Sequence, residues 1–200
     1  MFRASRSHES INVAADLQVG YSYNMDKSIP YKVVHRKVKH PRLEFKTKEL
    51  TVIVPHGYDP EIILTKYDKW ISRKHRLIQE CLKDAANKEM SDRTLGDLKD
   101  LVGVYLADVS RDLDVQVNKI LFRKMRTKWA SCSSHNNLTF NTLMTRLPDD
   151  LVAYIVLHEA AHMLERNHKK PFWNIITRYA NDYKAHEKEL HTYWYLIQDA

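Results

Sequence analysis

The sequence predicts an α+β fold, because strand-like and helix-like patterns occupy separate regions of its 200 residues. Positions 29–56 hold short runs in which apolar and polar residues alternate, the period of a half-buried strand. Positions 59–112 carry apolar residues at every third or fourth position, the period of a helix. Positions 117–200 return to two strand-like runs and then to helices, so we expect a small second sheet there.

Composition places ordinary bounds on the chain. A hydrophobic share of 44% suffices for the core of one domain, and we assign residues 29–200 to a single domain. No apolar run has the length of a membrane span, and the start lacks the apolar core of a secretory signal. Cys81 and Cys132 give no disulfide framework, which agrees with a reducing compartment. We therefore expect a cytoplasmic protein without membrane contact.

The N-terminal region divides near Pro30. Residues 1–28 are mixed polar with weak periodicity, so we predict a weakly structured segment there. The runs 31–38, 42–46 and 50–55 then follow one another with turn-like residues between them, which predicts a three-stranded antiparallel meander. The residues expected to point inward are Val33, Leu43, Phe45, Val52 and Val54.

The outward face of this meander is basic, and the whole chain carries a net charge of +7. The charged residues are Lys32, Arg36, Lys37, Lys39, Arg42, Lys46 and Lys48. Such a face could contact the phosphates of a nucleic acid or a nucleotide. It could equally be a solvated face that discourages pairing of sheet edges, and the sequence leaves both interpretations open.

Two long helices are predicted between residues 59 and 112, as a scaffold. Asp59 and Pro60 open the helical region, and residues 67–88 read as one helix. Its expected buried side consists of Trp70, Lys74, Leu77, Ile78, Cys81, Leu82 and Ala85. After a polar break, Thr94 and Asp97 have the spacing of a capping box, and an apolar stripe continues to Asp112.

A third helix carries the residues of chemical interest. Pro148 and the acidic residues after it suit a first helical turn, and the following residues are apolar almost all round, so we expect burial. One polar stripe runs through Tyr154, His158 and His162. The two histidines lie one turn apart on one face, so both imidazoles can reach the same ion. Glu159 sits beside that face and could accept a proton from water held by the metal.

Burial of these groups favours a metal site over two core histidines. Two imidazoles and a carboxylate in a core cost several kcal/mol unless something pairs with them, and a cation would do so. His168 is the expected third ligand. A continuing helix would place it about 240° round from His162, so the helix must end first. A left-handed Asn167 and the effect of Pro171 on the preceding residue predict a break within 166–170. A surface histidine in a basic turn is the alternative.

Three segments of the catalytic core, residues 117–200, resemble a known family. They are KMRTKWASCSS (124–134), NNLTFNTLMTRLP (136–148) and YIVLHEAAHMLERNHKKPFW (154–173). Together, residues 117–183 are similar to the YgjP-like metallopeptidases, which are related to the SprT-like zinc proteases. One departure is Ala130, where the family usually has glycine in Trp-Gly-Ser-Cys.

This resemblance implies a zincin-like fold of the minigluzincin type. It implies one zinc ion per chain on His158, His162 and His168, with Glu159 as the catalytic carboxylate and a peptide as substrate. Amphipathic helices within 172–197 are expected to close the domain over its core.

The segments around the metal helix supply candidate substrate contacts. In zincins a strand edge beside the metal helix aligns the substrate backbone, and we expect strand 136–140 in that role. Trp129, Ser131 and Asn141 are candidate substrate-binding residues. Cys132 as a nucleophile is the weaker alternative, because the zinc site already provides one.

Three functions therefore stand as hypotheses. The first is a zinc metallopeptidase. The second is a metal-dependent nucleoside triphosphate pyrophosphatase acting on UTP, because members of the resembling family have been described in this way. The third is a basic nucleic-acid-associated module with a structural metal, which would need a fourth protein ligand such as Cys132.

Overall fold

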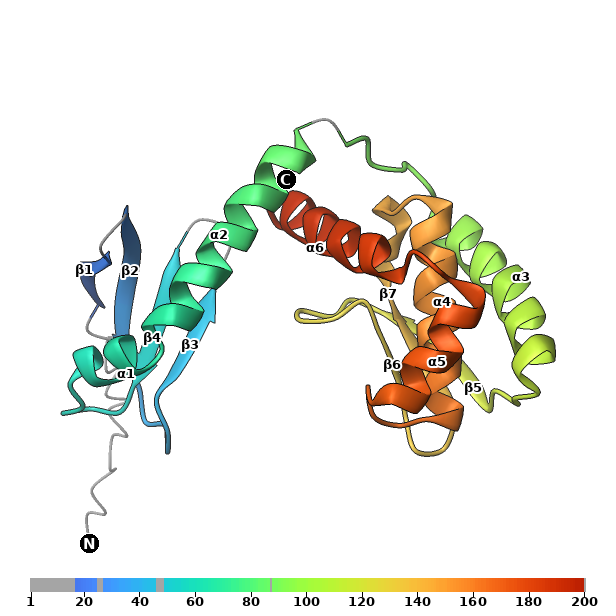
Figure 1. Cartoon of the computed structure of the whole chain (residues 1–200), viewed down its shortest axis with the longest axis horizontal. Helices are drawn as coiled ribbons and strands as arrows, with labels where there is room; N and C mark the ends of the chain where they lie inside the picture. Colours follow the sequence, from blue (N-terminus) through green and yellow to red (C-terminus); the bar gives the residue numbers. More distant parts are fainter. Residues whose placement is uncertain (1–16, 25–26, 46–48, 87, 200) are drawn as a thin grey trace, which may run out of the picture. The chain divides into compact units, whose positions relative to one another are not determined.

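The computed structural model describes residues 17–24, 27–45, 49–86 and 88–199 (Figure 1). Strands and helices fall in separate regions, which confirms the α+β class. The chain divides into two compact units, Met1–Leu77 and Ile78–Ala200. None of the helices in the described ranges combines the length and the apolar composition needed to cross a membrane. The assignment of 29–200 to one domain stays a prediction.

The first unit contains a four-stranded mixed sheet rather than a meander. Its strands are β1 (Leu17–Asn24), β2 (Lys27–His35), β3 (Arg42–Phe45) and β4 (Leu50–Val54), in the order β1-β2-β4-β3. The predicted antiparallel meander is wrong, because β4 lies between β2 and β3 and runs parallel to β2. The physical reason is burial: every residue of β4 is buried, so the strand takes a central place, whereas half-exposed β3 takes an edge.

The expectation of a weakly structured segment over 1–28 is also wrong in part. Residues 17–24 form β1, which pairs antiparallel with β2, whereas 1–16 lie outside the described residues. A strand signal was present in the sequence, since Leu17, Val19, Tyr21 and Tyr23 alternate with small or polar residues.

Two helices follow the sheet of the first unit. Asp59 accepts a hydrogen bond from the Glu61 backbone N–H at 3.0 Å and so caps α1 (Pro60–Lys66), as the Asp-Pro pair predicts. A break at Tyr67 separates α1 from α2 (Asp68–Ala85). Trp70, expected on the buried side of α2, is exposed, and its neighbour Ile71 is buried instead. The buried stripe of α2 is Ile71, Ile78, Cys81 and Ala85.

The basic face of the first sheet is partly neutralised within the sheet. Lys32 forms an ion pair with Glu49, and Arg42 forms another with Glu44 at 2.8 Å. Arg36, Lys37 and Lys39 are exposed, whereas Lys46 and Lys48 lie outside the described residues. Contact with a nucleic acid or nucleotide through this face stays a prediction.

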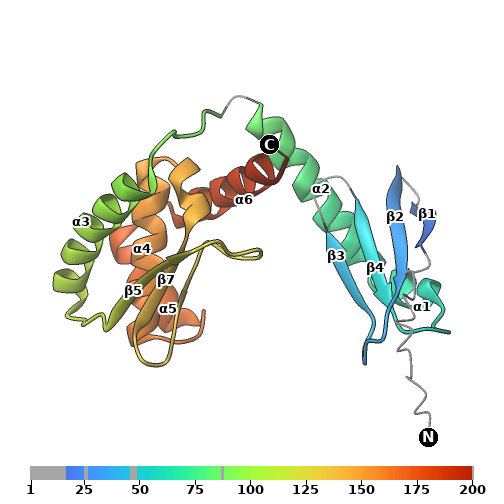
Figure 2. The same ribbon diagram turned by 180° about the vertical axis from the view of Figure 1, so that it is seen from behind.

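The second unit is built around the helix α4 (Asp149–Leu164). Its sheet has the order β5-β7-β6, where β5 is Lys119–Arg123, β6 is Ala130–Cys132 and β7 is Asn137–Asn141. Strand β7 runs parallel to β5 and antiparallel to β6. The sheet lies in front of α4 in Figure 2 and α5 (Lys170–Tyr179) lies in front of it in Figure 1, so α4 is packed between them. The unit also contains α3 (Leu95–Leu113), the short 3-10 helix η1 (Thr142–Arg146) and α6 (Tyr183–Asp199).

The capping box expected at the start of α3 is confirmed. The Asp97 N–H donates to Thr94 Oγ1 at 3.2 Å, and the Thr94 N–H donates back to Asp97 Oδ2 at 2.9 Å. The apolar stripe of α3 then packs in the same core as α4, through Leu98, Val102 and Leu106. This pairing of α3 with α4 supports the expected scaffold role of the helix.

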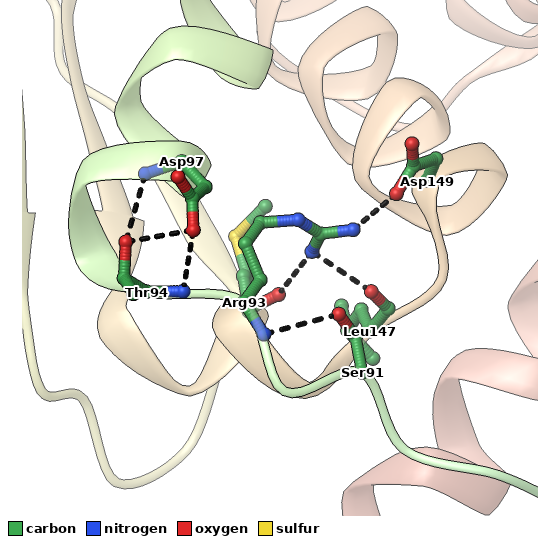
Figure 3. A network of polar contacts seen from close by, with 7 residues as sticks. Ser91, Arg93, Thr94, Asp97, Leu147 and Asp149 are labelled. Atoms are coloured by element: carbon green, nitrogen blue, oxygen red, sulfur yellow. Dashed lines mark hydrogen bonds and ion pairs between the residues drawn. The ribbon is translucent and has the colours of Figure 1, made fainter.

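Arg93 ties the start of α4 to the segment before α3 (Figure 3). Its guanidinium donates to the Leu147 carbonyl at 2.9 Å and to the Met144 carbonyl at 3.4 Å, and it pairs with the Asp149 carboxylate. The side chain is only 10% exposed, so the Leu147 carbonyl depends on it for a hydrogen bond, whereas the Met144 carbonyl also accepts from the Leu147 N–H at 3.1 Å. Arg93 therefore fixes where η1 ends and α4 begins.

We expect Arg93→Ala to lower the free energy of unfolding by about 2–3 kcal/mol, because it leaves carbonyls without a charged donor. Asp149 is 63% exposed, so its pair with Arg93 adds little. Urea denaturation followed by circular dichroism measures the change. Arg111→Ala is the matched control, since it breaks an exposed pair with Asp108. Equal losses in the two variants would contradict this role for Arg93.

Candidate metal centre

The end of α4 places the candidate ligands. The helix stops at Leu164, where Glu165 leaves it with an extended backbone (φ −130°). Among the described residues other than glycine, positive φ occurs only at Asp114 and Asn136, so the expected left-handed Asn167 is wrong. Pro171 lies in the first turn of α5, so the chain breaks over 165–169 and a new helix starts at once. His168 sits in this short turn.

The structure brings His158, His162 and His168 together. One ring nitrogen from each lies within 4.8 Å of the others, and His158 Nε2 is 2.9 Å from His168 Nε2. Ligand nitrogens about 2.0–2.1 Å from a tetrahedral zinc ion are roughly 3.3 Å apart, so small side-chain shifts would seat a cation. The spacing therefore fits a three-histidine site.

Neighbouring groups orient the three rings. The Glu165 carbonyl lies 3.0 Å from His162 Nδ1, which favours the tautomer protonated at Nδ1 and leaves Nε2 for a metal. Trp173 Nε1–H donates to the His168 carbonyl at 3.1 Å and holds the turn. Fully buried Phe172 lies beneath all three imidazoles, with ring centroids 4.6–4.9 Å apart. The site thus has an apolar floor.

Burial keeps two of the imidazoles neutral. It lowers the pKa of His158 to about 3, and the proximity of His162 and His168 acts in the same direction. Burial also lowers the pKa of His162, although the hydrogen bond to the Glu165 carbonyl opposes this. Both side chains are therefore neutral near pH 7, the form in which histidine binds a metal.

Glu159 lies beside the histidines with a buried carboxyl group, and the residue is 7% exposed. Burial raises the pKa of Glu159 to about 7, while the charge of Lys128 and a hydrogen bond from the Cys132 backbone lower it. Within the described part of the chain, Glu159 Oε2 and Thr51 Oγ1 are the buried side-chain atoms without a hydrogen-bond partner. An unpaired buried carboxylate oxygen is costly, and a cation held by the adjacent imidazoles would offset that cost.

Strand β6 presents a free edge beside α4. The Asn141 N–H donates to the Trp129 carbonyl at 2.7 Å, and the Ser133 N–H donates to the Asn137 carbonyl at 2.9 Å. Because antiparallel pairing alternates, the backbone groups of the residues between, Ala130 and Cys132, point away from β7. No other strand of the described ranges pairs with that outer edge.

The expectation that strand 136–140 aligns a substrate is wrong. These residues belong to β7, which has β5 on one side and β6 on the other, so both of its edges are already paired. Strand β6 is the edge strand that contacts α4. The sequence did not reveal this strand, because Ala130–Cys132 is only three residues long.

Asn141 has no polar atom left for a substrate. Its Oδ1 accepts from the Met125 and Leu143 N–H groups, both at 3.1 Å. Its Nδ2 donates to the Met125 and Lys128 carbonyls, both at 2.9 Å. The side chain is fully buried, so it shapes the loop before β6 and caps η1 rather than binding a substrate. The sequence-based assignment of Asn141 is corrected accordingly.

Trp129 and Ser131 lie at the edge strand. Trp129 is half-buried and packs edge-on against Trp194 of α6, with ring centroids 4.9 Å apart. Ser131 is half-buried within β6 and lies opposite Thr139. Both residues flank the free edge, so both stay candidates for substrate contact.

Arg166 joins the β6–β7 hairpin to the turn that carries His168. Its guanidinium donates to the Ser133 carbonyl and to Asn136 Oδ1, both at 2.7 Å, and lies 3.3 Å from Cys132 Sγ. Sequence analysis missed this contact, because nothing in a turn marks an arginine as the partner of a distant hairpin. Arg166 therefore fixes the edge strand relative to the third histidine.

The chain matches the model of the family described as YgjP-like, metallopeptidase domain, over residues 27–193. The chain belongs to the YgjP-like metallopeptidase family. The match runs from β2 into α6 and so confirms, and extends beyond 117–183, the resemblance read from the sequence.

Two solved structures are also similar to this chain. The metallopeptidase zymogen jannalysin of Methanocaldococcus jannaschii is 30% identical, with a TM-score of 0.38, over 47% of this chain and 91% of its own. The metallopeptidase zymogen abylysin of Pyrococcus abyssi is 23% identical, with a TM-score of 0.40, over 44% of this chain and 88% of its own. Comparison with curated proteins gives no match.

We expect Cys132 to react slowly with iodoacetamide in the folded protein at about pH 8, because its thiolate fraction is small. Burial raises the pKa of this thiol, although the charge of Arg166 opposes the shift. Less thiolate is then present than at an ordinary cysteine, and the rate should rise as the pH is increased. Mass spectrometry of the Cys132 peptide measures the rate, with the urea-unfolded chain as control. Faster labelling in the folded chain would contradict the expectation and revive Cys132 as a nucleophile.

Proposed function

We propose that this chain is a zinc-dependent metallopeptidase that hydrolyses peptide bonds with a metal-activated water. The observation that carries the proposal is the convergence of three imidazoles, with the buried Glu159 next to His158 on α4. The family match supports the peptidase class. The free edge of β6 next to this cluster adds a place for an extended substrate.

His158, His162 and His168 would hold the metal. Neutral histidine ligands suit zinc, and three protein ligands leave one coordination position open. When bound, zinc lowers the pKa of a coordinated water toward neutrality and polarises the substrate carbonyl. Cys132 does not complete the set, because its thiol is directed to Arg166 and lies outside the histidine cluster. An open site of this kind favours hydrolysis over a purely structural metal.

Glu159 would transfer the proton of the attacking water. From its place next to His158 on α4, its carboxyl would accept the proton of the attacking water and deliver it to the leaving amine. The Cys132 backbone hydrogen bond and the surrounding burial hold the carboxyl in one place. The residue thus acts as base and then as acid in the same position.

The substrate would lie along β6. An extended peptide can pair with the outward backbone groups of Ala130 and with the outward carbonyl of Cys132, as a strand added to a sheet edge, while the Cys132 N–H bonds the Glu159 carboxyl. Trp129 and Ser131 would then flank the bound chain. The proposed substrate is therefore a peptide or protein segment in extended conformation.

No observation favours the other two functions. UTP hydrolysis would need groups that hold phosphates, and the described glycines of the second unit, Gly96 and Gly103, lie within α3 and form no phosphate loop. A nucleic-acid module would rest on charge alone. We also propose a cytoplasmic location, because Cys81 and Cys132 are both free thiols.

Purified protein should carry about one zinc ion per chain, measured by elemental mass spectrometry. His168→Ala should retain markedly less zinc after dialysis, because two ligands remain where three converge. The matched control is His40→Ala, which alters an exposed histidine of the first unit. Absence of zinc from the wild-type protein, even after incubation with the ion, would overturn the proposal.

Glu159→Gln should lower the rate of peptide hydrolysis by at least about 100-fold while zinc content stays unchanged, because the amide cannot accept the proton. Cleavage of an unstructured protein, followed by mass spectrometry of the fragments, measures the rate. Glu165→Gln, at the end of the same helix, should leave the rate unchanged.

Cleavage by Glu159→Gln at the wild-type rate would refute the assigned role. Incubation with a panel of nucleoside triphosphates separates the second hypothesis. Release of pyrophosphate without any peptide cleavage would replace the peptidase proposal.

A further inference from the structure

Helix α6 brings a carboxylate to His158 from outside the metal-binding segment. Glu187 Oε1 accepts a hydrogen bond from the Tyr154 hydroxyl at 2.7 Å. The same oxygen lies 3.9 Å from His158 Nδ1. Tyr154 and His158 are one turn apart on α4, so a single oxygen of α6 faces two successive positions of the polar stripe on that helix.

The two nitrogens of His158 face different partners. Nε2 lies toward His168, at 2.9 Å from its Nε2, so this side of the ring belongs to the histidine cluster. Nδ1 lies on the side of Glu187. An imidazole that binds a metal through Nε2 carries its proton on Nδ1, and this proton needs an acceptor. Glu187 Oε1 is placed to be that acceptor.

The position of Glu187 is held from two directions. Tyr154 is buried, and its hydroxyl fixes one carboxylate oxygen. The residue that follows on α6 is also tied down, because Lys188 pairs with Asp84 at 2.8 Å. The separation of 3.9 Å exceeds a hydrogen bond, and rotation of the partly exposed Glu187 side chain can close it.

We propose that Glu187 is a positioning residue for His158, accepting a hydrogen bond from Nδ1–H when the imidazole binds the cation, with Tyr154 holding the accepting oxygen. This inference rests on the proposed zinc site. Glu187 is not itself a ligand, because it faces the side of the ring away from the cluster. Its negative charge makes the imidazole a stronger donor to the metal and fixes the ring orientation.

The test measures zinc affinity by competition with a chromophoric chelator. Glu187→Ala should bind zinc about 10–100-fold more weakly, the range found when such outer carboxylates are removed. Glu187→Gln should lose less, because its amide oxygen can still accept a hydrogen bond from Nδ1–H. Tyr154→Phe should also lose less than Glu187→Ala, since it removes only the group that holds the oxygen.

Glu189→Gln is the matched control. It changes a carboxylate on the same helix, two positions along, that pairs with Lys88 instead of facing His158. Its zinc affinity should equal that of the wild type. The visible absorption spectrum of the cobalt-substituted protein gives a second readout. The spectrum should shift in Glu187→Ala and stay unchanged in Glu189→Gln, because only the first removes the hydrogen-bond acceptor of the ligand His158.

Each outcome decides the inference. Wild-type affinity and an unchanged cobalt spectrum in a folded Glu187→Ala protein would overturn it, and the proposed function would stand if His168→Ala still weakened zinc binding. Equal weakening by Glu187→Ala and Glu189→Gln would also overturn it, since the effect would then come from the stability of α6. A wild-type chain that binds no zinc would remove the proposed function and this inference together.

Discussion

The burial of α4 is the constraint on which the second unit depends. Leu151, Val156, Ala160 and Ala161 are fully buried on different sides of the helix, so it must be covered by other elements almost all round. Helices α3, α5 and α6 and strand β6 provide that cover. Once the helix is buried, the Glu159 carboxyl is buried with it, and His158 and His162 are half-buried. Their removal from water is thus a consequence of the apolar residues around them.

That burial determines which groups can form hydrogen bonds with the polar side chains of α4. The more a polar group is buried, the more it depends on the chain or on a bound cation for a partner. For His162 the partner is the Glu165 carbonyl at the end of the helix, and for Tyr154 it is Glu187 of α6. Glu159 Oε2 obtains none from the described residues. Glu159 follows His158 directly on α4, so a cation held by the histidine cluster would bring positive charge close to this residue.

Sequence predicted those parts of the fold and site that depend on local signals. The capping box at Thr94, the buried helix after Pro148 and the spacing of His158 and His162 all follow from residues within one or two turns. The place of β4 inside its sheet depends on which strands are buried on both faces, a property of the whole sheet. Trp70 was expected to be buried and Ile71 is buried instead, because both adjacent positions border the apolar stripe of α2.

The contacts that sequence reasoning missed join segments far apart in the chain. Asn141 reaches Met125, Arg93 reaches Leu147, and Glu187 approaches His158. No periodicity links such pairs, and a polar residue in a loop or on a helix carries no mark of its distant partner. The turn around Asn167 was misjudged for a related reason, because Glu165 ended the helix without any left-handed residue.

Arg166 links the two halves of the proposed site. The turn that carries His168 and the hairpin that contains β6 share no backbone pairing, yet the guanidinium binds the Ser133 carbonyl and the Asn136 side chain. Asn136 adopts a left-handed conformation (φ 54°), so the hairpin turns sharply where the arginine holds it. The metal ligand and the substrate edge therefore rest on one common support. A displacement of the hairpin would move the edge strand and the third histidine together, which would keep the proposed substrate edge in register with the candidate metal ligand.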